Sequence, residues 1–460
     1  MMSFLRYSRK RAAWLVSPFS CYGQHALPHV LQTRGVPIYL YLHPDEVEPE
    51  ALQQLRTLAE SGLAERFVSV MPDVHLGKGA TVGSVFASKE FVVPNGVGVD
   101  IGCGMAAIPV ANLWKDDLIR ADGSFVPSVF KVQELIKQLI PTGFNSHRTP
   151  LPGALDTVAA ILRDSAPSEW LAQLVAGSAK VGCQLGSLGG GNHFLEVLAD
   201  EGGQVWLMLH SGSRWVGNHT ANHYNELAML QMRADGRPAA AGGRGGLNSL
   251  RIASEEGAQY LQDMLWCQAY ALANRRAMLR LMMDVVQRVF GRQAEQDRLI
   301  NTHHNFCSCE RCTFTDPATG AEVTESLWIT RKGATAAAPG QLGLIPGSMG
   351  TGSFVVEGKG EPRSWSSCSH GAGRRLSRTK AFELVSQADF ERSLDGIVCD
   401  RDAALRDEAP QAYKDLETVM SNQESLVAVR HRLTPLINVK GFGASQPAQR
   451  TQNAPRAGKG

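Results

Sequence analysis

The sequence of 460 residues has no long apolar run and almost no net charge. A membrane-spanning helix needs about 18 consecutive apolar residues, and the longest runs, such as 205–209, are only as long as a strand. The sequence therefore predicts no membrane partner. With 46 basic and 44 acidic residues the formal charge is +2, which excludes a protein held to nucleic acid by bulk charge alone.

Cysteines are also few. Nine cysteines in so long a chain are too scattered for a disulfide framework, which favours a reducing compartment. We therefore expect a cytoplasmic protein. The alternative is a weak organelle-targeting segment, because the first 25 residues are basic and free of acid around a short apolar stretch at 12–16.

Glycine is the residue in excess. Its 46 copies make one residue in ten, against roughly seven per cent in ordinary proteins. The glycines cluster beside polar or metal-capable residues and strand-like apolar runs, in the segments 77–83, 96–104, 186–191, 340–352 and 371–373. Because glycine lets a backbone approach a ligand closely, five such loops predict one composite site built from the whole chain.

The secondary structure predicted between these loops is mixed. Strands are expected in the β-branched and aromatic runs 67–71, 81–86, 204–210 and 327–330. A long helix is expected from Ser254 to Gly291, with acidic residues in its first turn and apolar residues at helical spacing. A second helix is expected over 402–430 with an interruption near Pro410, and a surface loop over 239–246.

Several residues have the chemistry of metal ligands. Asp100 and Cys103 stand three apart in a loop of small residues, although a buried cysteine beside a surface aspartate is the alternative. Histidines in similar surroundings follow downstream, at His193, His210, His303 and His304. A mixed set of thiolate, carboxylate and imidazole suits Mn, Fe, Co or Zn better than Mg.

Two further groups compete as metal sites. His219 and His223 stand four apart on a predicted helix but lack the glutamate of the zincin pattern, so we assign them to the surface. A tight cluster of cysteines follows the histidine pair and has two interpretations, a structural zinc site with a fourth ligand or three reduced thiols in a loop. These cysteines are Cys307, Cys309 and Cys312.

Two segments have residues that could bind a phosphate group or react with it. The segment 346–353 places hydroxyl residues among glycines, which offers backbone and side-chain donors to an anion, although no Walker pattern is present. His370 stands among small residues with Arg374 nearby. A neutral imidazole can attack phosphorus and hold a phosphoryl group covalently, and a polar histidine without that role is the alternative.

Eight motifs in order resemble the RtcB family of RNA-splicing ligases, over roughly 32–441. The motifs are MPDVHLGKGATVGSV at 71–85, GVDIGCGM at 98–105, GGGNHFLE at 189–196, HSGSR at 210–214, HHN at 303–305, RKGA at 331–334, PGSMGTGS at 346–353 and HGAGR at 370–374. The resemblance implies a single large α+β domain, with mixed sheets and surrounding helices around a metal-lined cleft. The segments 1–31 and 442–460 would be a flexible N-terminal extension and a basic low-complexity tail.

The resemblance also implies the reaction. RNA ends with a 3'-phosphate or a 2',3'-cyclic phosphate would be joined to 5'-hydroxyl ends, with GTP and two manganese ions. His370 would be the nucleophile that becomes guanylated. The residues at the positions of the metal ligands are Asp100, Cys103, His193, His210 and His304, with Cys103 bridging the ions. The residues at the positions of the guanylate contacts are Asn192, Phe194, Glu196, Ser348, Thr351, Ser353, Ala372, Tyr413 and Lys440.

Specificity depends on single residues within this scheme. A carboxylate such as Glu196 can accept from guanine N1 and N2, which explains GTP rather than ATP. Arg214 and Arg374 are candidates to hold RNA phosphates. The departures from the family are peripheral: the extra cysteines, a slightly longer segment at 313–325, and the two ends of the chain.

Two alternative functions remain at this point. One is a metal-dependent cyclic phosphodiesterase that does not use GTP, and the other is a non-catalytic RNA-binding paralogue. The intact His370 and the Ser348 loop argue against the phosphodiesterase. A paralogue would be expected to have lost a metal ligand or the nucleophile, and none is lost here. The sequence does not separate tRNA splicing from RNA repair, and it leaves open the need for an archease-like activator and the oligomeric state.

Overall fold

The computed structural model describes residues 27–237 and 243–441, and these form a single mixed α+β domain. The expected fold class is therefore confirmed. The predictions for residues 1–26, for 239–242 of the surface loop and for the tail 442–460 lie outside the described residues.

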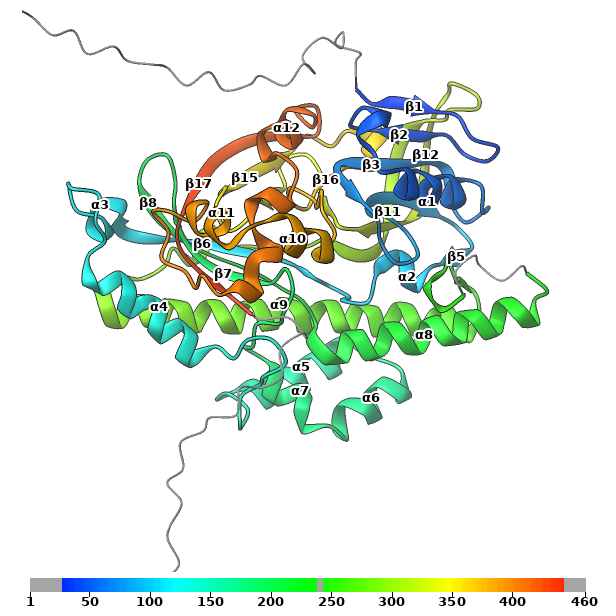
Figure 1. The fold of residues 1–460 in the computed structure, drawn as a ribbon. Helices are drawn as coiled ribbons and strands as arrows, with labels where there is room; N and C mark the ends of the chain where they lie inside the picture. The colour runs from blue at the N-terminus through cyan, green and yellow to red at the C-terminus, as the bar shows by residue number, and fades with distance from the viewer. Residues whose placement is uncertain (1–26, 238–242, 442–460) are drawn as a thin grey trace, which may run out of the picture.

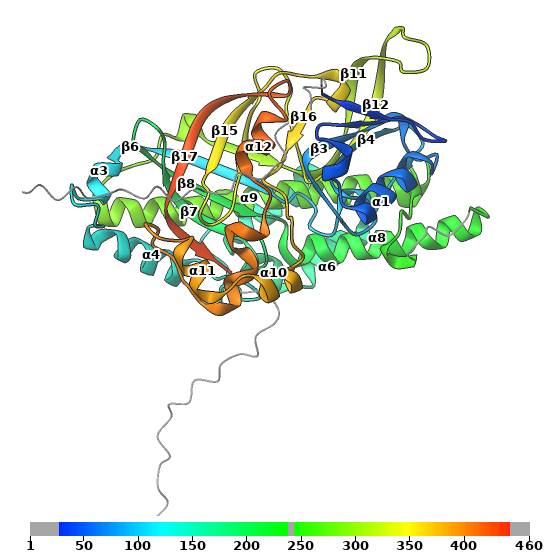
Figure 2. The same cartoon turned by 45° about the horizontal axis from the view of Figure 1, so that its top comes forward.

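Two large sheets lie side by side above a layer of helices (Figures 1 and 2). The first has six strands in the order β1 (His29–Leu31), β2 (Ile38–Leu40), β3 (Glu65–His75), β4 (Val82–Ser88), β12 (Glu322–Lys332) and β11 (Asn305–Thr315). The second has seven strands in the order β10 (Ile300–His303), β6 (Gly104–Trp114), β8 (Gln204–Ser211), β7 (Phe194–Ala199), β17 (Val427–Lys440), β15 (Ser353–Gly358) and β14 (Leu342–Pro346). Two short pairs complete the sheets, β13 (Ala334–Ala336) with β16 (Ser367–Ser369), and β5 (Phe91–Val92) with β9 (Leu250–Arg251).

The two longest helices run below both sheets, and shorter helices lie beneath them and around the sheets (Figure 1). The α-helices are α1 (Pro49–Ala59), α2 (Pro94–Val97), α3 (Lys115–Leu118), α4 (Pro127–Leu139), α5 (Ala154–Ser165), α6 (Glu169–Ala176), α7 (Ala179–Gln184), α8 (Arg214–Ala234), α9 (Glu255–Phe290), α10 (Arg378–Leu384), α11 (Gln387–Arg392) and α12 (Leu416–Ser421). The 3₁₀ turns are η1 (Pro44–Glu46), η2 (Gly243–Gly245), η3 (Gln296–Arg298), η4 (Pro362–Ser364), η5 (Ala403–Glu408) and η6 (Pro410–Ala412).

The long helix α9 has the ends that its sequence predicts. The Ser254 side chain accepts from the backbone N–H of Gly257, and Glu255 and Glu256 lie in the first turn, where the helix dipole favours negative charge. At the other end Gly291 takes a left-handed conformation with φ 67°, which ends the helix. No helix of 27–237 or 243–441 is long and apolar enough to cross a membrane.

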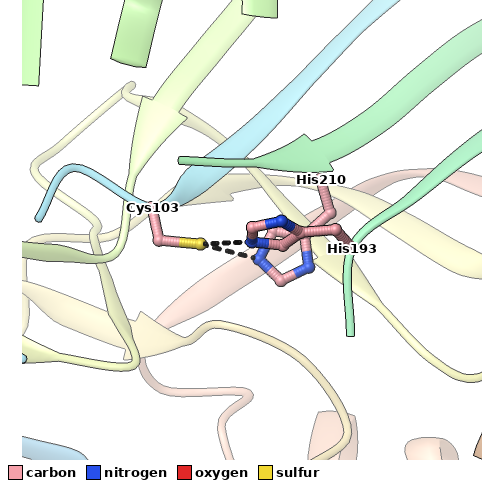
Figure 3. Close-up of side chains that lie close together, drawn as sticks. All are labelled: Cys103, His193 and His210. Atoms are coloured by element: carbon pink, nitrogen blue, oxygen red, sulfur yellow. Dashed lines mark hydrogen bonds between the residues drawn. The ribbon is translucent and has the colours of Figure 1, made fainter. Parts of the chain in front are cut away.

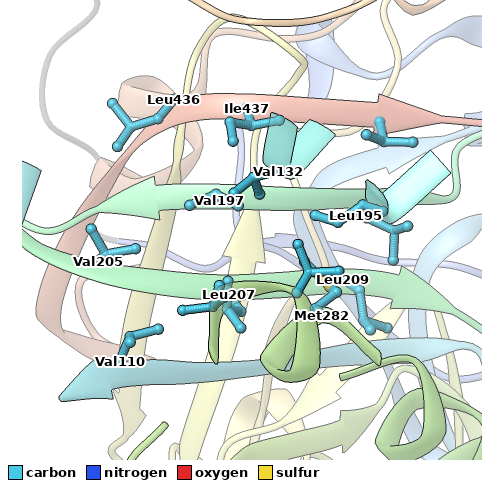
Figure 4. Packing of buried hydrophobic residues seen from close by; sticks show 14 of the residues in the cluster. Val110, Val132, Leu195, Val197, Val205, Leu207, Leu209, Met282, Leu436 and Ile437 are labelled. Carbon is cyan, nitrogen blue, oxygen red and sulfur yellow. The ribbon is translucent and has the colours of Figure 1, made fainter. Parts of the chain in front are cut away.

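The main core lies between the seven-stranded sheet and the helices α4 and α9. Leu195 of β7 and Leu207 of β8 pack with Val132 of α4 and Met282 of α9 (Figure 4). Each of these side chains is at most 2% exposed, and burying one such side chain contributes roughly 1.5–3 kcal/mol. This packing fixes the sheet on which the candidate site is built.

The four strands predicted from β-branched runs are confirmed: 67–71, 204–210 and 327–330 lie within β3, β8 and β12, and 81–86 begins one residue before β4. The helix predicted over 402–430 is wrong. Its first part forms the turns η5 and η6, only α12 is an α-helix, and β17 begins at Val427. The strand β17 pairs with both β15 and β7, so hydrogen bonds to two neighbours override the local helical pattern.

Candidate active site

The neighbouring strands β10, β6, β8 and β7 of the seven-stranded sheet have ends that lie side by side. The candidate metal ligands lie at these ends or next to them. Gly104 at the start of β6 pairs with Ser211 at the end of β8 and with His303 at the end of β10. Phe194 at the start of β7 pairs with His210. Since neighbouring strands run in opposite directions, these ends lie together. The residues gathered here are Asp100, Cys103, His193, His210 and His304.

The thiol of Cys103 points at the imidazoles of His193 and His210 (Figure 3). Its Sγ is 3.4 Å from Nε2 of His193 and 3.2 Å from Nε2 of His210. Nε2 of His210 is 3.2 Å from Nε2 of His304, and Nε2 of His193 is 3.2 Å from Oδ2 of Asp100. The ligand atoms thus form two groups around Cys103, one with Asp100 and His193 and one with His210 and His304.

The donor set fits a divalent metal. Nδ1 of His210 lies 3.1 Å from the carbonyl oxygen of Asn192, which only accepts, so Nδ1 carries the proton. Nε2 then directs a lone pair at Sγ of Cys103 and Nε2 of His304. Lone pairs that converge in this way repel each other unless a cation lies among them. Imidazole, thiol and carboxylate together favour a first-row transition metal over magnesium.

Burial sets the charge of these ligands. Burial lowers the pKa of His210 and of His304 well below the usual range, as do the charges of neighbouring histidines, so both rings are neutral. Burial and the Asp100 charge raise the pKa of the Cys103 thiol. Burial also opposes ionisation of Asp100, but the hydrogen bond and charge of His193 leave its pKa below the ordinary value. A divalent cation would stabilise the thiolate, which is the metal-binding form.

Glycine is required where the turn after β8 passes Asp100. A Cβ at Gly212 would lie 2.2 Å from Oδ1 of Asp100. The next residue, Ser213, donates its backbone N–H to the same oxygen at 3.1 Å. The HSGSR motif therefore leaves room for the carboxylate and orients it.

His370 follows β16, which pairs with β13 and so brings the histidine beside His304. The two ring centroids are 4.9 Å apart. Nδ1 of His370 donates to Oδ2 of Asp73 at 2.6 Å, and the same oxygen accepts the backbone N–H groups of His370 and Gly371 at 3.1 and 3.2 Å. With Nδ1 engaged, Nε2 is the free nitrogen of His370, and the residue lines the same cleft as the metal candidates.

Asp73 was not among the predicted site residues. It is 0% exposed, and burial opposes its ionisation, yet the charge and hydrogen bond of His370 keep its pKa below the ordinary value. Lys414 holds the neighbouring backbone by donating to the carbonyl oxygens of Pro72 and Val74 at 3.0 and 2.7 Å. The signal that would have found Asp73 is its place in the MPDVH motif.

Lys332 was missed as well. Its buried ammonium donates to the carbonyl oxygen of Asn95 at 2.8 Å and to that of Lys78, and it lines the cleft. Burial, together with the charge of Lys78, lowers the pKa of Lys332 to about 7. Its place in the RKGA motif was the available signal.

Most of the residues expected to contact guanylate line the same cleft. Those that do are Asn192, Phe194, Glu196, Ser348, Ser353, Ala372, Tyr413 and Lys440. Glu196 lies deep on β7, where Oε1 accepts from Nδ2 of Asn438 at 2.7 Å. Burial raises the pKa of Glu196 to about 7, although Asn438 and Lys440 act in the opposite direction.

Thr351 differs, because it is not among the residues that line the cleft. Its hydroxyl accepts the backbone N–H of Ser348 at 2.7 Å and lies 3.1 Å from the Ser348 hydroxyl. In this position Thr351 shapes the turn between β14 and β15 that presents Ser348.

Glu408 was not among the predicted site residues, yet it contacts four residues that line the cleft. It accepts from the hydroxyl of Tyr413 at 2.6 Å, from Arg378 at 2.8 Å and from Arg374 at 3.2 Å, and it pairs with Lys440. Burial opposes its ionisation, but the charges of Lys440 and Arg378 lower the pKa of Glu408 to about 2. The carboxylate therefore holds four polar groups in fixed positions.

The two arginines proposed for RNA phosphates lie on different sides of the metal candidates. Arg374 lines the cleft and donates to Leu376, Asp407 and Glu408. Arg214 begins α8 and lines a second groove that shares Asp100 and His193 with the cleft.

The competing metal clusters have other surroundings. Along β11 Cys307 is buried, Cys309 is exposed and Cys312 is partly buried. Because side chains alternate along a strand, Cys312 points to the opposite face from Cys307, which is unsuited to one tetrahedral site. His219 and His223 stack on Trp170, with ring centroids 6.1 and 3.8 Å from it, on the surface of α8.

Comparison with known proteins gives one consistent result. The family model described as tRNA-splicing ligase RtcB matches residues 54–441. An Escherichia coli protein named RNA-splicing ligase RtcB1 is 38% identical over 435 residues, covering 90% of this chain and 99% of its own length. The tRNA-splicing ligase RtcB of Thermococcus kodakarensis is 32% identical over 472 residues, covering 87% of this chain and 94% of its own.

The match spans the strands that carry the candidate ligands as well as His370 and Lys440. Both the length of the match and the level of identity are sufficient to assign the family. The chain therefore belongs to the RtcB family of RNA-splicing ligases and is an RNA ligase.

Proposed function

We propose that this ligase joins RNA ends carrying a 3'-phosphate or a 2',3'-cyclic phosphate to 5'-hydroxyl ends, with manganese and GTP, through a guanylated His370. The observation that carries the proposal is the contact of His370 with Asp73. It engages Nδ1 at 2.6 Å and leaves Nε2 free beside the metal-ligating atoms. Phosphoryl transfer needs a positioned nucleophile next to concentrated positive charge.

Two manganese ions would be held by the two groups around Cys103, one by Asp100 and His193 and the other by His210 and His304. The neutral imidazoles and the mixed donor set support this assignment. When bound, the metal supplies positive charge that offsets the negative charge of the triphosphate and of the reacting RNA phosphate.

His370 is the nucleophile of the first transfer. Its Nε2 forms a bond to the α-phosphorus of GTP while the bond from that phosphorus to the bridging oxygen breaks, and pyrophosphate leaves. The ring becomes positively charged as the N–P bond forms. Asp73 stabilises that charge and keeps the proton on Nδ1, so that Nε2 stays available.

The RNA end must be activated before joining, because a 3'-phosphate monoester has no good leaving group. A cyclic phosphate is first hydrolysed to the 3'-phosphate. An oxygen of the 3'-phosphate then attacks the phosphorus on His370, the N–P bond breaks, and GMP becomes attached to the RNA end. The oxygen of the 5'-hydroxyl then attacks the 3'-phosphorus, the bond to the GMP oxygen breaks, and GMP leaves. The proton of the 5'-hydroxyl passes to solvent or to a nearby base.

Glu196 would select guanine. Its carboxylate accepts from the N1–H and N2–H of guanine, whereas adenine presents an acceptor at N1. Asn438 fixes one carboxylate oxygen at 2.7 Å, which supports a defined orientation. The other expected guanylate contacts surround Glu196 in the cleft, with Thr351 acting through Ser348.

The proposal extends to the setting of the reaction. It includes a cytoplasmic location, a catalytic unit spanning 32–441, a role in tRNA splicing or in RNA repair, and an archease-like activator. The relatives include proteins named tRNA-splicing ligases, which supports the splicing role.

The test uses purified full-length protein loaded with manganese and incubated with α-labelled GTP. We expect wild-type protein to retain label on a denaturing gel and to lose it in acid, as a phosphoramidate does. His370→Ala should retain none. His431→Ala is the matched control, since His431 lies on β17 outside the cleft, and it should label normally.

Absence of label from wild type, with manganese content verified and an archease-type activator added, would contradict the guanylated intermediate. The cyclic phosphodiesterase would then be the better assignment if cyclic ends are still opened. Equal labelling of His370→Ala and wild type would place the nucleophile elsewhere.

A further inference from the structure

A second groove opens beside the metal candidates. It shares Val99, Asp100, His193 and Arg378 with the cleft that contains His370. Its other walls come from the loop at 143–144, from the start of α8 and from α10. A polymer lying in this groove would therefore have its end at the metal-ligating atoms.

The wall formed by the 143–144 loop carries an exposed aromatic ring. Phe144 is 79% exposed, the highest value among the large hydrophobic side chains of the described residues. The loop is nevertheless held in place, because Gly143 donates to the carbonyl oxygen of Gly189 at 2.9 Å and accepts from Nη2 of Arg214 at 2.8 Å. An exposed phenyl ring on a tethered loop at a groove is typical of a stacking platform.

Neighbouring residues of the groove supply positive charge and a second aromatic ring. Trp215 lines the groove, and the ammonium of Lys180 lies 5.1 Å from its ring centroid. Arg214 hydrogen-bonds only to uncharged groups in the part of the chain described, Ser187 and Gly143. Arg378 differs, because Asp407 and Glu408 neutralise it. Within the described residues, Lys180 and Arg214 thus line the groove without a salt bridge to a carboxylate, although the charge of Asp100 acts on Arg214.

We propose that this groove binds the RNA nucleotide next to the reacting end, with its base stacked on Phe144 and its phosphate held by Arg214 and Lys180. The inference rests on RNA being the substrate and on the metal-ligating group being the reaction centre, but it does not depend on GTP. Other proteins bind single-stranded nucleic acid with the same combination of basic groups and aromatic rings.

The groove also contains acidic side chains, which limit where a phosphate can lie. Glu383, Asp407 and Glu408 line it near α10 and η5, and Asp407 and Glu408 are paired with Arg378. The end of the groove near Phe144, Lys180 and Trp215 has no carboxylate among its described lining residues except Asp100 at the metal group. The phosphate therefore belongs at this end.

The test compares Phe144→Ala, Phe144→Tyr and Phe144→Leu in the manganese-loaded, full-length protein. Loss of base stacking on the ring in Phe144→Ala should raise the KM for RNA roughly 5- to 100-fold. Labelling with GTP in the absence of RNA should be unchanged. The tyrosine variant should retain wild-type KM, and the leucine variant should not, because it keeps apolar area without a ring. Phe130→Ala is the matched control, since Phe130 is 54% exposed on α4 and lines neither groove.

An abasic nucleotide beside the junction distinguishes stacking from a structural effect. Placed on the strand that uses the groove, it should weaken wild type by the same factor as Phe144→Ala and weaken the variant no further. The 3'-phosphate strand and the 5'-hydroxyl strand are tested separately. Binding of a fluorescent RNA measured by anisotropy without GTP keeps this result independent of the guanylation chemistry.

Lys180→Ala gives an additional measure of phosphate binding. For single-stranded RNA the plot of log affinity against log salt concentration has a negative slope. Losing one phosphate contact in Lys180→Ala should make that slope about 0.7 less negative. The proposal is overturned if Phe144→Ala keeps the RNA KM and affinity within about twofold of wild type, or if the abasic and Phe144→Ala effects multiply on both strands. If Phe144→Ala binds RNA as wild type does, the exposed Phe144 ring would instead be assigned to contact with a protein partner.

Discussion

Replacing Asp73 by asparagine should show how strongly the guanylation of His370 depends on its partner Asp73, because the histidine itself is kept. The Asp73 carboxylate is 0% exposed and accepts three hydrogen bonds, one from Nδ1 of His370 and two from backbone N–H groups. Asparagine has nearly the same shape, and its amide oxygen can take the place of Oδ2 as the acceptor, but it carries no charge. The imidazole then loses the charge that favours the proton on Nδ1 and that stabilises the ring as it becomes positive.

The expected loss is large in the rate and moderate in stability. Aspartate-to-asparagine changes beside a catalytic histidine lower the rate by about 10⁴-fold in the best-studied case, so we expect a fall of roughly 10²- to 10⁴-fold in the rate of His370 guanylation. Loss of a hydrogen bond to a buried charged group costs about 1.5–3 kcal/mol of unfolding free energy. Manganese content should be unchanged, since Asp73 is not among the metal-ligating group.

The assay is single-turnover labelling with α-labelled GTP, followed by acid treatment, with metal content and denaturant unfolding measured on the same preparations. Asp263→Asn is the matched control. Asp263 is also 0% exposed and accepts from the backbone N–H and hydroxyl of Ser168 and from the hydroxyl of Tyr224, each at 2.7 Å, but it lines neither groove. It should lose stability and keep its labelling rate. An Asp73→Asn protein that labels within about threefold of wild type would refute the positioning role.

Two further predictions concern the metal group and the guanine site. Gly212→Ala should lower manganese content, measured by elemental analysis, because a Cβ would lie 2.2 Å from Oδ1 of Asp100; wild-type metal content in a folded variant would contradict this. Burial raises the pKa of Glu196 from 4.5 to about 7, so its contribution to stability is present below about pH 4.5 and is lost as the pH rises to about 7. Glu196→Gln should remove this part of the pH dependence of unfolding without nucleotide and weaken GTP labelling; an unchanged pH profile would show that Glu196 is not the group responsible.

The sequence predicts those parts of the fold whose signals are local. The helix α9 has its capping serine, its acidic first turn and its terminal glycine within its own sequence, and its ends follow from them. After Pro410 the segment 402–430 has such a signal only for the short helix α12, where the Asp415 side chain accepts the backbone N–H of Thr418. Its outcome depends on hydrogen bonds that β17 makes with β15 and β7, and these strands are distant in the sequence.

The same distinction applies to the site. Cys103, His193 and His210 have ligand chemistry next to glycine-rich loops, which is visible in the sequence, and the strand register then brings them within 3.4 Å. Asp73 meets His370 across 297 residues, through the pairing of β16 with β13 and the path of β3, so its partner cannot be read from spacing. Phe144 has no periodic pattern around it, and only its exposure beside the second groove distinguishes it.

The most direct test of the account is a chase of the guanylated protein. Wild-type protein is labelled with α-labelled GTP, freed of unbound nucleotide, and mixed with manganese, an RNA ending in 3'-phosphate and an RNA beginning with 5'-hydroxyl. The account predicts that label leaves His370 as GMP while one RNA joint forms for each guanylate released, without further GTP. Label that stays on the protein while RNA is joined, or joining that needs fresh GTP for every event, would contradict it.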